Sequence, residues 1–101
     1  MASRLELQTR LEEILGSENC YFQPPASLKM SYPAIRYKLN SIDKINANNR
    51  AYNLLRSYEV TVIDANPDSE IPNKVLQLPM CRFNRYYTAD NLNHFVFTLY
   101  Y

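Results

Sequence analysis

The side chains in this chain that could carry chemistry are few and far apart. His94 is the only histidine, and the two cysteines, Cys20 and Cys81, are separated by most of the sequence. A metal site or a nucleophile with its base needs such groups gathered at short spacing. The pattern therefore predicts no metal centre, no cofactor and no enzymatic activity, and it predicts that both thiols stay reduced. We interpret His94 as a residue at a strand edge or an interface.

A second group of polar residues lies near one expected turn. Asp64, Asp68 and Glu70 are close in sequence, and clustered carboxylates can hold a hard cation. An Asx-turn that leads into a helix N-terminus explains the same residues without a ligand. The structural interpretation is therefore favoured.

The third group mixes bases with aromatic residues. Arg82, Arg85, Tyr86 and Tyr87 follow the pattern of single-stranded nucleic-acid binders, and also that of protein–protein hot spots. The chain has 11 Lys and Arg against 10 Asp and Glu, whereas nucleic-acid modules are usually strongly basic. Because the chain has a single glycine, a glycine-rich phosphate loop is not expected. The composition favours a protein interface.

Length and hydropathy limit the architecture that positions these residues. The 101 residues are predicted to form one domain over positions 1–101. No apolar run is long enough to span a bilayer, and the first residues lack the apolar core of a signal peptide. We expect a protein made in the cytoplasm without membrane contact. Nine tyrosines suit either an interface or strands.

The N-terminal segment reads as a helix over residues 4–15. Ser3 and Glu6 fit a capping box, and leucines and isoleucines recur at helical spacing behind them. Gly16 stands where a left-handed C-cap is needed. Residues 17–32 are predicted to be a connector, since Pro24 and Pro25 cannot lie inside a helix.

Four later segments alternate apolar and polar residues, as half-buried strands do. These strands are expected at residues 34–39, 54–64, 81–88 and 94–101, with a five-residue turn at 89–93 between the last two. Ser69 can cap a short helix over residues 70–78 between the second and third strands. The fold class is therefore α+β, with a four-stranded, mainly antiparallel sheet and its helices on one face.

Residues 40–53 are predicted to be a long loop rich in asparagine. Loops of this length are uncommon in small domains unless they have a function. It is either an arm that binds a partner or a plain surface hairpin tip, and we favour the arm.

Taken in order, these segments make the chain resemble small neck and tail-completion proteins of long-tailed bacteriophages, above all the tail terminators. The segments that carry the resemblance are the capped helix, Tyr32-Pro33-Ala34-Ile35, Tyr58–Asp64 with Pro67-Asp68-Ser69, the short helix ending at Leu78-Pro79, and the final hairpin from Arg85-Tyr86 through Asp90–Phe95.

The resemblance implies a structural virion protein of the neck. Tail terminators form a hexameric ring that caps the tail tube and docks it to the head connector. The implied partners are further copies of the chain, the tail tube protein, the connector or stopper protein, and genomic DNA that passes through without sequence-specific contact. The alternative implied by the same likeness is a head–tail adaptor or stopper.

A ring needs heterologous interfaces, and an uncovered strand edge is a natural place for one. We expect the strand that begins after Pro33, or the terminal strand from Phe95 to Tyr101, to be such an edge. The residues predicted to form the assembly interface are Ser41, Asp43, Lys44, Asn46, Asn48, Asn49, Arg50, Tyr52, Arg82, Arg85, Tyr86, His94, Tyr100 and Tyr101.

Overall fold

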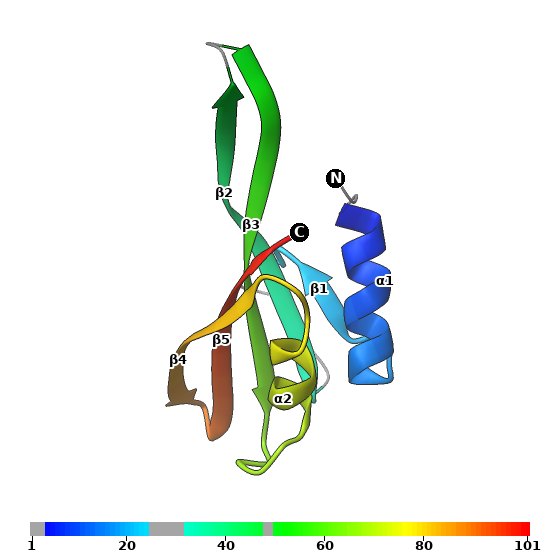
Figure 1. Ribbon diagram of the computed structural model, residues 1–101. Helices are drawn as coiled ribbons and strands as arrows, with labels where there is room; N and C mark the ends of the chain where they lie inside the picture. The colour runs from blue at the N-terminus through cyan, green and yellow to red at the C-terminus, as the bar shows by residue number, and fades with distance from the viewer. Residues whose placement is uncertain (1–3, 25–31, 48–49) are drawn as a thin grey trace.

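The computed structural model describes residues 4–24, 32–47 and 50–101, and side chains are described outside 44–54 (Figure 1). Two helices lie on one face of a five-stranded sheet, and a narrow two-stranded extension makes the molecule 50 Å long and about half as wide. The elements in chain order are α1 Arg4–Leu15, β1 Cys20–Phe22, β2 Ala34–Ala47, β3 Arg50–Asp64, α2 Ile71–Leu76, β4 Cys81–Ala89 and β5 Leu92–Tyr100.

The sheet has the strand order β1-β2-β3-β5-β4. All neighbours are antiparallel except β1, which runs parallel to β2 with Cys20 opposite Ile35. The α+β class agrees with the sequence, whereas the expected four-stranded sheet is wrong in detail. The predicted connector at 17–32 contains β1, a strand of three residues that is too short to show an alternating pattern.

The first helix has the bounds that its periodicity predicts. Leu7 and Leu11 are fully buried and face the sheet. Gly16 follows with φ +79°, and its N–H donates to the carbonyl of Glu12 over 2.9 Å. A left-handed residue of this kind ends the helix at no steric cost only if it is glycine. Ser3, the predicted N-cap, lies outside the described residues.

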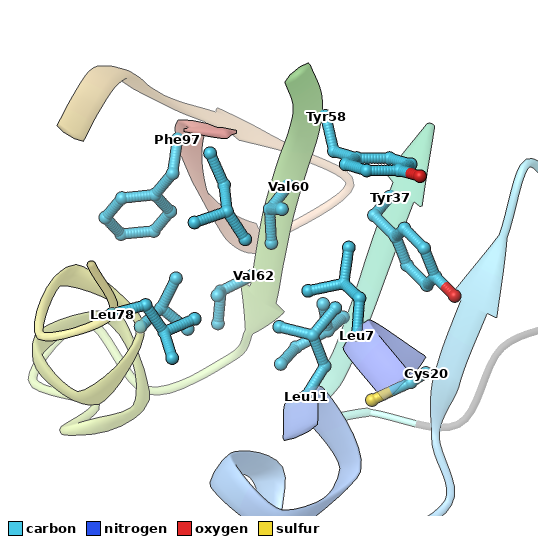
Figure 2. Close-up of a cluster of buried hydrophobic side chains, with 12 residues drawn as sticks. Leu7, Leu11, Cys20, Tyr37, Tyr58, Val60, Val62, Leu78 and Phe97 are labelled. Atoms are coloured by element: carbon cyan, nitrogen blue, oxygen red, sulfur yellow. The ribbon is translucent and has the colours of Figure 1, made fainter. Parts of the chain in front are cut away.

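The core lies between the helices and one sheet face (Figure 2). Alternate residues of β3 point into it, with Tyr58, Val60 and Val62 almost completely buried. Leu11 of α1 approaches from one side and Leu78, just after α2, from the other. This one-sided core requires both helices to pack on the same face, as the sequence predicts.

The last hairpin turns more tightly than expected. Ala89 pairs with Leu92, so the turn contains two residues and not five. Those residues, Asp90 and Asn91, have φ values of 54° and 62°. Two consecutive left-handed residues match the twist of a two-residue hairpin, and Asp and Asn tolerate them better than most side chains. The turn therefore forms without the glycine that the sequence lacks there.

Among the described residues, neither helix has the length and apolar character needed to cross a membrane.

Candidate functional site

The predicted loop at residues 40–53 is wrong: residues 40–47 belong to β2 and residues 50–53 belong to β3. The two strands pair from Ser41 opposite Ser57 to Ala47 opposite Arg50, and Asn48 and Asn49 between them lie outside the described residues. The β-branched Ile42 and Ile45 favour a strand here, whereas the asparagines favour a turn and led to the prediction of a loop. We call residues 41–47 and 50–56 the arm.

The arm extends beyond the rest of the sheet and points upward in Figure 1. Strand β1 reaches β2 only as far as Tyr37, and β5 reaches β3 only as far as Ser57. Within the described residues, no third strand therefore pairs with the two arm strands, although the Arg56 carbonyl at the arm base accepts from the N–H of Tyr101. An isolated two-stranded hairpin is marginally stable in water, so the arm gains stability from any surface that covers it.

Hydroxyl and amide groups fix the base of the arm. A register shift between Leu39 and Ser41 leaves Asn40 as the extra residue of a bulge. The Oγ atoms of Ser41 and Ser57 are 2.6 Å apart, and Asn40 Nδ2 donates to Ser57 Oγ over 3.3 Å. Since Ser57 is fully buried, these bonds hold the direction in which the arm leaves the domain. Ser41, predicted at an interface, therefore has an internal partner.

The bulge also decides which way the next side chains point. Leu39 lies on the same sheet face as the helices, whereas Ser41 lies on the opposite face with Ser57. By alternation, Ile42 points to the helix side and Asp43 to the helix-free side. Both side chains are exposed, and Ile42 presents half of its surface to solvent.

Strand β4 forms one edge of the sheet, with β5 as its neighbour on one side and no neighbour on the other among the described strands. Seven of its nine residues are exposed, on both faces of the sheet, whereas five of the nine residues of β5 are buried. The edges expected from the sequence are wrong. The strand after Pro33 lies between β1 and β3, and the terminal strand lies between β3 and β4.

The helix-free face of the sheet is covered by long polar side chains from four strands. Arg36 Nη2 donates to the hydroxyl of Tyr87 over 3.3 Å, and the Tyr87 ring stacks on His94 with centroids 4.6 Å apart. Arg85 lies over the same tyrosine ring, and its guanidinium is 3.8 Å from a carboxylate oxygen of Glu59. We call these five residues the polar cluster. It lies over Thr61 and Val96, which are almost fully buried although no described helix packs there.

His94 is therefore neither an edge residue nor exposed. Its strand has neighbours on both sides, and only 8% of its surface is accessible. Its Nδ1 lies 3.2 Å from the carbonyl oxygen of Leu92, a geometry in which Nδ1–H donates. The second face of the sheet thus has a small core of its own, with His94 inside it.

The Arg and Tyr pattern on β4 is divided between two faces. Tyr87 belongs to the polar cluster, whereas Tyr86 points to the helix side, packs on Phe95 with centroids 5.0 Å apart and donates to Asn93. One ring face of Tyr87 is already occupied by His94. The two tyrosines therefore do not form the continuous stacking platform that a single strand of nucleic acid uses.

On the helix side, β4 and α2 enclose an open hollow of about 300 Å³. Its floor is Phe95 and Phe97, and its rim includes Leu76, Phe83 and Tyr86. Each rim residue exposes about half of its surface. Clustered exposed aromatic side chains of this kind are typical of protein contact surfaces. The hollow was not predicted from the sequence, in which Leu76 and Phe83 stand on either side of Pro79 and share no local repeat.

The remaining predicted interface residues are dispersed. Arg82 is exposed on β4, and Tyr100 and Tyr101 end the chain beside the arm base, where Tyr101 N donates to the Arg56 carbonyl over 3.1 Å. Lys44, Asn46, Arg50 and Tyr52 have strand positions in the arm, but their side chains lie outside the described ones.

The groups considered for catalysis have structural surroundings. Asp64 accepts from the N–H of Asn66, and Asn66 accepts from Asp68, both over 3.0 Å, so this segment is a pair of Asx-turns. Burial raises the pKa of Cys20 to about 12, helped by Glu12, and burial raises that of Cys81 to about 11. Across the described residues, no three His, Cys, Asp or Glu side chains gather as a metal would require.

No protein-family model and no curated protein matches the sequence.

Proposed function

We propose that the protein is a structural subunit of the neck of a long-tailed bacteriophage, the tail terminator that forms a hexameric ring on the tail tube and docks it to the head connector. The proposal begins from the resemblance of the segment order. Its partners are further copies of the chain, the tail tube protein and the connector protein, and the assembled virion is its final location.

The observation that carries the proposal is the arm. A strand pair that leaves the domain and pairs only with itself among the described residues is well suited to reach a neighbouring subunit. The bonds among Asn40, Ser41 and Ser57 fix its direction, so the arm is presented in one orientation. A preoriented arm loses less conformational freedom on binding than a flexible loop does.

The free edge of β4 supports the same proposal. A ring subunit needs two different surfaces, each matching the other on the next copy. The arm and β4 lie in different parts of the molecule, the arm above the domain and β4 at its lower left (Figure 1). The nearly balanced charge also suits a channel through which DNA slides without being held.

The test is coexpression of the tagged chain with the products of the genes on either side of its own, followed by electron microscopy of the purified complexes. We expect rings at one end of tail tubes, and tubes that stop growing once the ring is bound. Binding to the portal side alone would instead identify an adaptor or stopper. Absence of any association with tube, portal or connector would overturn the proposal.

A further inference from the structure

We propose that the arm of one copy adds as a strand to the free β4 edge of the next copy, with β2 of the arm against β4. This inference rests on the proposed ring function and specifies its subunit contact. The occupant of the hollow beside α2 is then a second copy of this chain.

The two edges are similar in length. Strand β4 has nine residues, Cys81–Ala89. The outer side of β2 is used by β1 and by Gln23, whose side chain accepts from the N–H of Leu39 over 3.2 Å. Beyond that point, residues 40–47 present backbone groups that no described strand uses. Unpaired edges of comparable length satisfy each other by adding one strand to the sheet.

The side chains of the two edges also match on both faces. Ile42 lies on the helix side of the arm, and the aromatic hollow lies on the helix side of β4. Asp43 lies on the helix-free side, where Arg82 and Arg85 project from β4. A pairing that brings the apolar side chain to the hollow therefore also brings the carboxylate to the arginines.

Apolar burial and charge pairing contribute differently to this contact. Ile42 and the hollow rim gain by burying apolar surface that is open to solvent in one copy alone. Arg85 already has Glu59 at 3.8 Å, so Arg82 is the better partner for Asp43. Charge pairing at such a rim mainly fixes register and rejects wrong partners.

A charge-swap experiment tests the contact. Asp43→Arg and Arg82→Asp each place like charges at every junction, and both sites are exposed, so folding should be unaffected. We expect each variant alone to self-associate at least about tenfold more weakly than the original chain, measured by analytical ultracentrifugation. Mixed in equal amounts, the two variants should assemble again, because every junction then joins opposite charges.

Cysteine cross-linking checks the position independently of affinity. Asp43→Cys in one copy and Arg82→Cys in another, both carrying Cys81→Ser, should form a mixed disulfide under mild oxidation at high concentration. The matched control is Asp43→Cys mixed with Lys74→Cys, an exposed position on α2 that should not cross-link. The inference would be overturned if both charge variants associated as strongly as the original chain. It would also be overturned if the test and control mixtures cross-linked equally, or if neither mixture cross-linked.

The two proposals fail separately. If the chain binds tube ends but positions 43 and 82 do not cross-link, the neck function stands and the arm–edge contact is wrong. If the cross-link forms but no tube, portal or connector protein is bound, the contact stands and the neck function is wrong.

Discussion

Arg36 on β2 donates a hydrogen bond to the hydroxyl of Tyr87 on β4, although β3 and β5 lie between these strands. The hydrogen bond spans the helix-free face, on which Thr61 and Val96 of the two intervening strands are almost fully buried. The face without a helix is thus protected by the stems and rings of polar residues, which keep their charged or polar ends in water.

The first prediction concerns this cover. Tyr87→Phe removes the hydrogen bond from Arg36 and keeps the ring on His94, so it should lower the free energy of unfolding by about 1 kcal/mol. Arg36→Ala should cost more, because it also uncovers apolar surface. Urea unfolding measures both. Arg82→Ala, an exposed arginine on the same face, is the control, and a loss there as large as for Arg36→Ala would contradict the role of the cluster.

The second prediction concerns the main core. Phe97 is only 1% exposed, so Phe97→Ala should lower the free energy of unfolding by roughly 3–5 kcal/mol through lost burial and a cavity. Phe83 is directly opposite on β4, with ring centroids 5.6 Å apart, but it is half exposed. Phe83→Ala is the matched control and should cost clearly less. Equal losses in thermal or urea unfolding would mean that the exposed ring is as tightly packed as the buried one.

The third prediction concerns the arm alone. Because no third described strand pairs with the arm, its backbone amides should exchange with deuterium much faster than those of residues 57–63, which have strands on both sides. Hydrogen exchange with mass spectrometry measures this in the free chain. Addition of assembly partners should slow exchange in the arm, and equal protection of arm and domain in a monomer would argue against an uncovered arm.

The fourth prediction shortens the arm. Replacing residues 43–55 with Asn-Gly joins Ile42 to Arg56, a pair that already faces across the strands, through a favoured two-residue turn. The melting temperature should stay close to that of the original chain, while assembly is lost. A correctly folded short-arm variant that still gives particles with tails of normal length would contradict the role of the arm in assembly.

The fifth prediction concerns pH. Burial raises the pKa of Cys20 from 9.0 to about 12, so the folded chain favours the neutral thiol. Its contribution to stability is complete below pH 9 and is lost as the pH rises toward 12. Cys20→Ala should therefore flatten the alkaline decline in unfolding free energy. At pH 8, a thiol reagent should modify the folded chain slowly and the urea-unfolded chain rapidly; fast labelling of the folded chain would contradict the burial.

The sequence predicted the elements whose side chains repeat at a clear local period. The helix 4–15, the alternating Tyr58, Val60 and Val62, and the alternating faces of β5 all appear where their patterns indicate. Such patterns record which side of an element meets the core, and that information is local.

Other features were missed because local patterns were weak. Asparagines in the segment 40–53 favour turns, yet each strand there supplies the hydrogen-bond partners of the other and stays extended. Strand β1 has three residues and is held by β2 from a distant part of the chain. Arg36, Glu59 and Tyr87 come from three different strands, and no local pattern indicates that their side chains lie on one part of the sheet face. The register shift between Phe83 and Arg85 also puts Tyr87 and Phe83 on opposite faces, although simple alternation places them together.

The chain's own residues thus determined the α+β class, the core-facing positions and the presence of exposed Arg and Tyr on β4. Only the tertiary structure decided the strand order, and with it that β4 and not the terminal strand lies at an edge of the described sheet. The physical reason is that the alternation of apolar and polar residues indicates which face of the sheet a side chain lies on, but not which strand lies beside its own. That choice depends on which distant strands bury the most surface and satisfy the most backbone hydrogen bonds together.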